Sequence, residues 1–420
     1  MSIVSLCMIV KNEADHLPGC LESVRALVDE IVVVDTGSTD QTVEIAESFG
    51  AEVYRFAWKD DFSAARNESL RHAAGDWVAF LDADERLNCM GEPDCLRKAA
   101  SDPRIDAYLV PIKNYRKGSN AVDPQLAHAI RFFRRYPDIH FVGKVHERVD
   151  VFLEKQGAAI SRSAFFIEHL GYDVEQSRME RKWRRNLALL RKQIEEDPED
   201  AHSYYHLGLT LLALDREDES RRELDCALQY VGSNATLRAM ILNMISYCYL
   251  KKHEYPQAIE AAGKSLKIVP WQNMARVMLG FGHYFQRNYQ LALPLLLEAY
   301  EFFNLPPEKR QTAVHYEDTI ERSDHLKAIA MSYAETGQYA RAISFFHRLI
   351  DECGGDPDSI RCLGICYLNT QDFHAAVHHL KEAEKLGVHR SLLSKPLAYA
   401  LARIGRSGEA GQYSSTSPVQ

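Results

Sequence analysis

Two acidic residues placed two apart, Asp82 and Asp84, follow an apolar run at residues 77–81 and are the strongest candidates for chemistry. In extended backbone, residues two apart point the same way, so both carboxylates can face one point beyond the strand end. Because like charges raise each other's pKa, this pairing is costly without a cation. A divalent ion bridging to a diphosphate would remove that cost. The competing interpretation is an acidic, solvated loop.

Two more polar residues stand near the ends of predicted elements. Asp35 closes the apolar run 31–35, and its carboxylate either binds a nucleobase or ribose or serves only in the turn that follows. Arg66 lies near the start of a predicted helix, where a guanidinium can meet a base edge or a phosphate. The alternative for Arg66 is an ion pair with Asp61 or Asp40.

A β-α-β pattern in the N-terminal part must position these residues. Short β-rich apolar runs alternate with stretches of helical period, as in parallel sheets covered by helices on both faces. Functional loops then lie at the carboxyl ends of the strands. The predicted strands are 3–10, 31–35, 52–56, 77–81, 107–114, 130–134 and 165–169, and the predicted helices are 14–28, 39–49 and 62–74.

A helical repeat follows a predicted charged connector at residues 174–199. Pairs of small residues twelve apart recur, in places with a period of 34 residues, which resembles tetratricopeptide repeats. We expect about five such hairpins over residues 200–390, an insertion near 304–324, a capping helix at 391–405 and a disordered tail at 406–420. The pairs are Gly208 and Ser220, Ser246 and Ala258, Gly280 and Ala292, Ala330 and Ala342, and Gly364 and Ala376.

Composition and charge exclude several classes of protein. The 420 residues are 46% hydrophobic and 26% charged, as in an ordinary globular protein of two or three domains. Residues 1–175 hold 20 Lys and Arg against 29 Asp and Glu, the opposite of a nucleic-acid-binding surface. We find no leader peptide and no apolar run long enough to span a membrane, so we expect a cytoplasmic protein. Nine cysteines without a Cys-x-x-Cys pair predict neither disulfides nor structural zinc.

Four segments of residues 1–90 resemble the start of glycosyltransferase family 2, whose members have the GT-A fold. They read VSLCMIVKNE (4–13), VVDTGSTD (33–40), ARN (65–67) and FLDADE (80–85). With the repeats, nearly the whole chain resembles the bacterial glycosyltransferase–tetratricopeptide proteins, which include the sublancin-type S-glycosyltransferases. The resemblance implies an α/β GT-A nucleotide-sugar domain at 1–173, with a mainly parallel sheet and helices on both faces, followed by an all-α tetratricopeptide-type solenoid.

The resemblance also implies a UDP-sugar site with a divalent metal, Mn²⁺ or Mg²⁺. Many members carry two acids after the second strand, but here Thr36 takes the second place, which leaves the division of base contacts between Asp35 and Thr36 open. The uridine would be held by Val10, Asn12, Glu13, Asp35 and Arg66, and the metal–diphosphate by Asp82 and Asp84.

A histidine late in a GT-A domain often completes the metal site, and His169 is placed to do so. An imidazole beside carboxylates favours manganese somewhat over magnesium. The alternative is a histidine that only makes hydrogen bonds at the domain junction.

Family 2 enzymes invert the anomeric centre in one displacement, which requires a carboxylate base near the acceptor. Glu147 is the first candidate, with His146 orienting it or contacting the sugar, and Asp61 is the second. The alternative is that Glu147 only pairs with Arg148 or Arg131.

The leading hypothesis is an inverting transferase that moves a hexose from a UDP-sugar to a peptide or protein side chain. The repeats suggest this acceptor because solenoids offer concave surfaces to extended chains; self-association as a homodimer, with Leu305 near the contact, is the alternative role. Competing functions are transfer to lipopolysaccharide or another glycan, and a scaffold with an inactive sugar-nucleotide domain. A nucleotidyltransferase or dehydrogenase is disfavoured because no Gly-x-Gly-x-x-Gly follows the first strand.

Overall fold

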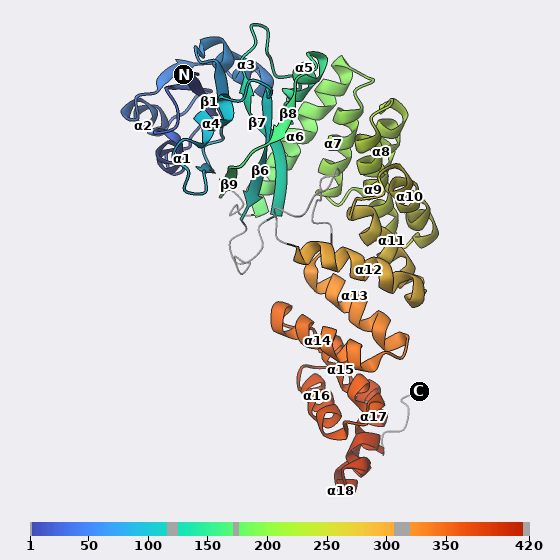
Figure 1. The fold of residues 1–420 in the computed structure, drawn as a ribbon. Coiled ribbons are helices and arrows are strands. Elements are labelled where there is room, and N and C mark those ends of the chain that lie inside the picture. The colour runs from blue at the N-terminus through green and yellow to red at the C-terminus, as the bar shows by residue number, and fades with distance from the viewer. Residues whose placement is uncertain (1, 116–124, 171–175, 306–319, 415–420) are drawn as a thin grey trace. The chain divides into compact units, whose positions relative to one another are not determined.

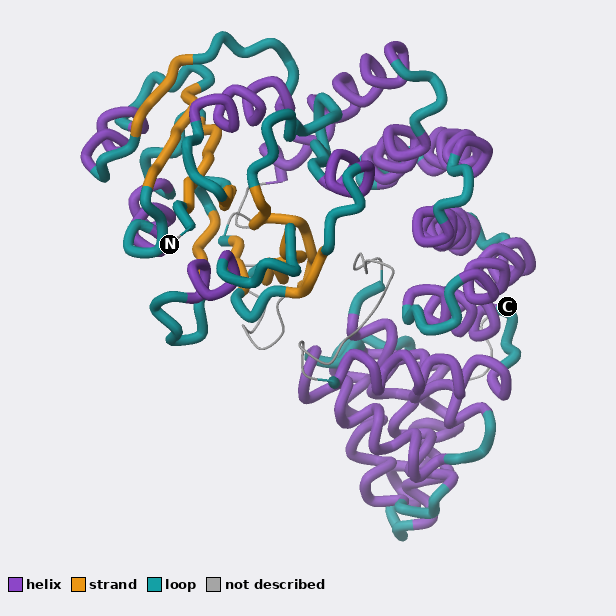
Figure 2. The backbone as a smooth tube through the Cα atoms, turned by 45° about the horizontal axis from the view of Figure 1, so that its top comes forward, coloured by secondary structure: helices purple, strands orange, loops and turns teal. Residues whose placement is uncertain are grey.

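The chain folds as two compact units, Met1–Gly232 and Ser233–Gln420. The computed structural model describes residues 2–115, 125–170, 176–305 and 320–414. Among these residues, strands occur only in the first unit, whereas the second consists of helices and their connections (Figures 1 and 2).

The described residues of the first unit form one sheet in the order β3-β2-β1-β4-β7-β6-β9-β5, with β8 beside β6. The four strands β1 to β4 pair in parallel, whereas β7 runs antiparallel to β4 and β6. The predicted parallel sheet is thus confirmed for β1 to β4. The remaining strands add antiparallel pairs, so the sheet as a whole is mixed. The strands are β1 Val4–Val10, β2 Glu30–Asp35, β3 Glu52–Arg55, β4 Trp77–Phe80, β5 Glu85–Asn88, β6 Ala107–Asn114, β7 Gln125–Arg134, β8 Ile160–Arg162 and β9 Phe166–His169.

Helices cover both faces of this sheet, as its two-sided apolar strands predict. Alternate β1 residues enter different cores: Leu6 packs in the cluster that includes α1, α2 and α4, and Cys7 in the cluster that includes α3 and α5. The carboxyl ends of β1, β2 and β4 therefore lie at one edge, between two helical layers. The helices are α1 Leu17–Val24, α2 Thr42–Ser48, α3 Phe62–His72, α4 Cys95–Ala100 and α5 Asp150–Lys155.

A cysteine pair corrects one prediction, because Cys89 and Cys95 form a disulfide. The turn between β5 and α4 passes through Met90 and Gly91, both with positive φ, and this reversal leaves the two Cα atoms 5.8 Å apart. Such a close approach cannot be read from the spacing of the cysteines. Cys362 and Cys366 are buried free thiols on a helix.

Helical hairpins make up the rest of the described chain, and they confirm the tetratricopeptide-type repeat. A Cβ added at the first small residue of three hairpins would lie 2.7 Å from a leucine of the second helix, at Gly208, Gly280 and Gly364. The helices are α7 Ala201–Leu212, α8 Glu217–Tyr230, α9 Ala235–Lys251, α10 Tyr255–Ile268, α11 Met274–Phe285, α12 Tyr289–Asn304, α13 Arg322–Glu335, α14 Tyr339–Cys353, α15 Pro357–Asn369, α16 Phe373–Lys385, α17 Arg390–Arg403 and α18 Ser407–Ser414. The predicted insertion near 304–324 falls mostly outside the described residues.

The end of the chain corrects a second prediction. Residues expected in a disordered tail form α18, so α17 is not the last helix. Ala410 is buried, Tyr413 donates a hydrogen bond to Glu384, and Lys381 pairs with Glu409, so this segment is fixed by contacts with α16 and α17. Residues 415–420 lie outside the described part of the chain.

The first unit includes a helix, α6 Gln176–Glu196, where the connector was predicted. Its Leu189 and Leu190 share a core with Val145, from the sheet region, and with Leu207 of α7. Gln193 accepts a hydrogen bond from the Lys144 amide at 2.7 Å. The sheet, α6 and the α7–α8 hairpin therefore belong to one unit, and the finer domain boundaries at residues 173, 199 and 390 stay predictions.

The close helix contact at Gly280 predicts a loss of stability on Gly280→Ala. The new methyl group would meet Leu296 at 2.7 Å, and overpacking of this kind costs about 1–3 kcal/mol. Gly263→Ala is the matched control, because Gly263 lies inside α10 with no atom within 4 Å of an added Cβ. That change should instead stabilise by about 0.5–1 kcal/mol. Urea unfolding of both variants measures the difference; equal effects would contradict the close contact.

Candidate active site

The pairing of three strands brings Asp84, His169 and Asn114 together. β5 begins at Glu85 and runs antiparallel to β9, with Glu85 opposite His169, and β6 places Asn114 beside the same histidine. His169 Nε2 lies 3.2 Å from Asp84 Oδ2, and its Nδ1 lies 2.7 Å from Asn114 Oδ1. Burial is the largest single influence on the pKa of His169 and lowers it. The hydrogen bond to Asp84 and the charges of the neighbouring carboxylates together outweigh burial, so the pKa is raised overall.

Asp84 and His169 fit a divalent metal. Two neighbouring ligands of an octahedral ion, each at about 2.1 Å, lie about 3 Å apart, close to their observed separation. Asn114 can accept the Nδ1 hydrogen, which leaves Nε2 as the coordinating nitrogen, an arrangement common around metal-bound histidines. This part of the predicted metal set is therefore assembled by the fold.

Asp82 has different partners from Asp84. Its Oδ1 accepts a hydrogen bond from Arg66 Nη2 at 2.8 Å, and its Oδ2 lies 3.6 Å from Arg131 Nη2. Burial would raise the pKa of Asp82, but the two guanidinium groups hold it well below its usual value. Among the described residues, three candidate ligand atoms come within 4.8 Å of one another only at His378, His379 and Glu382. The predicted set of Asp82, Asp84 and His169 is thus only partly brought together.

The two arginines flank a phenylalanine at the end of β4. The guanidinium carbons of Arg66 and Arg131 lie 4.7 and 4.4 Å from the centre of the Phe80 ring. Three buried nitrogens of these guanidinium groups have no hydrogen-bond partner in the described structure: Arg66 Nη1, Arg131 Nε and Arg131 Nη1. The aromatic face offers them a weak electrostatic attraction in place of a hydrogen bond. Arg66 pairs with Asp82 and Glu147, so the alternative of a pair with Asp61 or Asp40 is wrong.

Two further carboxyl groups carry raised pKa values at this edge. Burial raises the pKa of Glu85 to about 7 even though Arg131 donates to it at 2.9 Å. Burial, and after it the charges of Asp84 and Asp82, raise the pKa of Glu13 to about 7. Glu13 and the Asp-x-Asp pair therefore share one electrostatic environment. A bound cation would favour the ionised form of all three.

The loops after β1 and β2 are joined by hydrogen bonds. Asn12, with φ of 55°, accepts from the Thr39 amide at 2.7 Å, and the Thr36 hydroxyl donates to the carbonyl of Val10 at 3.1 Å. The buried Asp35 carboxylate accepts from the amide of Ser38 at 3.0 Å, so it does serve in the turn. Thr36 is committed to the backbone, and contacts of Asp35 with a base stay a prediction.

Glu147 reaches the Asp82 site through Arg66, whose Nε donates to Glu147 Oε1. Arg148 pairs with Asp150, and Arg131 with Glu85, so neither is the partner of Glu147. His146 has a positive φ of 53°, and its ring stacks on that of His206 of α7 with the ring centroids 4.0 Å apart. Burial lowers the pKa of both imidazoles.

Asp61 has a role in helix α3 itself. It is the N-cap residue and accepts from the Ala64 amide at 2.8 Å, a contact that satisfies one of the free amides of the first turn. Among the two carboxylates considered for the base, only Glu147 contacts the Arg66–Asp82 network directly.

Comparisons with known proteins agree with this architecture. Residues 5–165 match the model of glycosyl transferase family 2. A TPR repeat-containing protein of Synechococcus elongatus is 32% identical over 291 residues, which cover 66% of this chain and 71% of that protein. Residues 5–165 of this chain belong to glycosyltransferase family 2. The chain is a glycosyltransferase that carries tetratricopeptide-type repeats after its family 2 domain.

Other proteins resemble parts of the transferase. The SPbeta prophage-derived glycosyltransferase SunS of Bacillus subtilis is 30% identical over 222 residues, and the match spans 51% of this chain and about half, 50%, of SunS. The structure of YrrB, described as a TPR protein with an unusual peptide-binding site, covers 49% of this chain and 95% of its own at 23% identity, with a TM-score of 0.39. No helix in the described part of the transferase combines the length and apolar character needed to cross a bilayer.

Two residues of the transferase site, Glu85 and Asn114, were not singled out from the sequence, and Arg131 was considered only as a partner of Glu147. Arg131 lies in the Arg-x-x-Arg segment of β7, Glu85 follows the Asp-x-Asp pair, and Asn114 ends β6. A polar residue at the end of a strand was a usable signal for Asn114. Nothing in the sequence indicates that Arg131 reaches Glu85, because β7 and β5 are separated in the sheet by β6 and β9.

Proposed function

We propose that the transferase is inverting and metal-dependent, and that it moves a hexose from a UDP-sugar to a peptide or protein side chain. The observation that carries the proposal is the pair of Asp84 and His169, held 3.2 Å apart at the strand edge with Asn114 behind the imidazole. A bound Mn²⁺ or Mg²⁺ would neutralise charge on the departing diphosphate.

The residues around this pair divide the work of binding. Asp84 and His169 would hold the ion, and Asp82 Oδ2, 3.6 Å from Arg131 Nη2, would contact the donor. Val10, Asn12, Glu13 and Asp35 lie at the ends of β1 and β2, where the uridine is bound in this proposal.

Glu147 supplies the base. Its Oε1 is fixed by Arg66, and within the described part of the chain its Oε2 has no hydrogen-bond partner. Such a carboxylate keeps a defined position while one oxygen stays available to accept the acceptor's proton. His146, stacked on α7, orients the backbone beside it.

The peptide acceptor is supported by the resemblance to the sublancin-type enzymes and by the repeats, since stacked hairpins form surfaces that suit extended chains. The deciding experiment incubates the full chain with a panel of UDP-hexoses, with and without Mn²⁺, in the presence of peptides containing Ser, Thr and Cys. We expect metal-dependent UDP release and a hexose mass increase on peptide. Label appearing only on glycans would contradict the acceptor class, and no UDP release with any donor would contradict the proposal.

A truncation separates the role of the repeats from that of the catalytic unit. The cut should follow Gly232, because a cut at residue 173 would expose the core that Val145 shares with α6 and α7. Loss of peptide transfer with retained metal-dependent hydrolysis of UDP-sugar supports acceptor binding by the repeats. Unchanged peptide transfer would assign them another role, and light scattering of the full chain tests self-association.

A further inference from the structure

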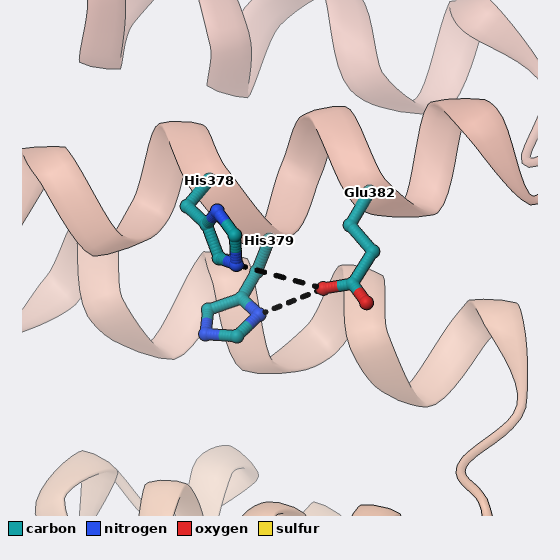
Figure 3. A group of neighbouring side chains, drawn as sticks. All are labelled: His378, His379 and Glu382. Atoms are coloured by element: carbon teal, nitrogen blue, oxygen red, sulfur yellow. Dashed lines mark hydrogen bonds and ion pairs between the residues drawn. The ribbon is translucent and has the colours of Figure 1, made fainter.

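Helix α16, far along the chain from the candidate active site, carries two adjacent histidines and a glutamate within one turn. His378 Nε2, His379 Nδ1 and a Glu382 oxygen lie within 4.8 Å of one another, and no other group of three in the described residues does so. Figure 3 shows both rings turned toward the same carboxylate. Two imidazoles and a carboxylate are a ligand set typical of zinc sites.

The distances suit a tetrahedral ion. Ligand atoms at about 2.0–2.1 Å from zinc lie about 3.4 Å apart. His379 Nδ1 is 3.3 Å from Glu382 Oε2, and His378 Nε2 is 4.0 Å from it. The side chain of His378 is 73% exposed, so rotation about its own bonds can close the remaining gap. The i, i+4 and i, i+3 spacings place His378 and His379 each beside Glu382 on the helix surface.

The second histidine is held in place by its neighbours. The ring of His379 stacks on Tyr367 of α15, with centroids 5.4 Å apart and planes 7° from parallel. Tyr367 in turn is hydrogen-bonded to His347 of α14 at 2.7 Å. This packing fixes one imidazole before an ion arrives, which reduces the entropy lost on binding.

A cavity of about 580 Å³ opens beside the cluster and gives access to it. His378 and Glu382 line it, together with Lys381, Lys385 and Arg406. Its other charged lining residues are therefore basic, and Val377, Leu386 and Ile404 supply an apolar part of the wall. An ion held by three protein ligands keeps a fourth position, and from this cavity a water molecule or anion can reach it.

We propose that α16 binds a zinc ion through His378, His379 and Glu382, at a site separate from the Asp84–His169 pair. The nitrogen-rich set selects zinc, copper or nickel over magnesium and calcium, which prefer oxygen ligands. The site lies in the helical unit and does not depend on the proposed transfer reaction.

The test is a calorimetric titration of zinc chloride into the untagged full chain, stripped of metal and carrying Asp84→Asn so that the active-site pair contributes less. We expect the chain with an intact cluster to bind one more equivalent of zinc than the same chain carrying the His378→Ala/Glu382→Ala double change. His374→Ala is the matched control, because this exposed histidine lies on the same helix and lines the same cavity but is outside the cluster.

Thermal unfolding gives a second measurement. Zinc should raise the melting temperature of the chain with an intact cluster but not that of the double variant, since an ion bound only by the folded state stabilises it. Circular dichroism checks that the double variant is folded. Equal zinc stoichiometry and affinity in both proteins would overturn the assignment, as would loss of the equivalent in His374→Ala alone.

Discussion

Asp84→Asn is expected to lower metal-dependent UDP release by on the order of 10²–10³-fold, the range seen when one group that stabilises developing charge is removed. The amide keeps the size of the side chain but loses the charge that, in our proposal, holds the ion beside His169. The concentration of Mn²⁺ that gives half-maximal activity should rise as well, so that added metal restores part of the rate.

Asp94→Asn serves as the control for this change. Asp94 precedes α4, makes no side-chain capping hydrogen bond and is exposed, so its amide should leave activity unchanged. Initial rates at several Mn²⁺ concentrations measure both variants. Near-normal UDP release by Asp84→Asn, with an unchanged metal requirement, would remove Asp84 from the metal site.

Asn114→Leu tests the same geometry from the other side of the histidine. Loss of its oxygen removes the hydrogen bond to Nδ1 of His169, and changes behind a metal ligand typically weaken metal binding by about 10–100-fold. We therefore expect Asp84→Asn, which alters a metal ligand, to reduce activity more than Asn114→Leu, which alters a residue behind a ligand.

The parts of the fold that depend on local pattern were predictable. The nearly continuous apolar run of β1, which is buried on both faces, and small residues such as Gly280 and Gly364 leave direct traces in the sequence, because each determines what can pack against it. β5 was missed because it directly follows the Asp-x-Asp pair and looks like a continuation of an acidic loop. Its four residues are a strand through pairing with β9, about eighty residues later in the chain.

The site shows the same division between local and long-range information. Asp82 and Asp84 were found because a strand end and a two-residue spacing are local features. The partners of Asp82 could not be found, because Arg66 and Arg131 come from α3 and β7, whose positions relative to β4 depend on tertiary packing. A sequence pattern can therefore name the charged residues of such a site without saying which charges neutralise one another.

Glu147→Gln is the second change with a large expected effect. If Glu147 is the base, transfer to the acceptor should fall by on the order of 10²–10⁴-fold, while binding of the UDP-sugar persists. The glutamine can still accept the hydrogen bond from Arg66 Nε, so the donor side of the site should keep its arrangement. Single-turnover transfer and UDP-sugar titration measure the two properties separately.

The same substitution also weakens the buried network, and this effect must be separated from catalysis. Arg66 and Glu147 have only 7% and 14% of their side chains exposed, so replacing the charged acceptor should lower the free energy of unfolding by about 1.5–3 kcal/mol. Rates are therefore compared well below the unfolding transition, with Glu154→Gln, an exposed change on α5, as the control. A variant that is less stable yet transfers sugar at a near-normal rate would show that Glu147 only positions Arg66. Glu147 is assigned as the base if the variant is folded, still binds UDP-sugar, transfers sugar slowly and shows an altered dependence of the transfer rate on pH.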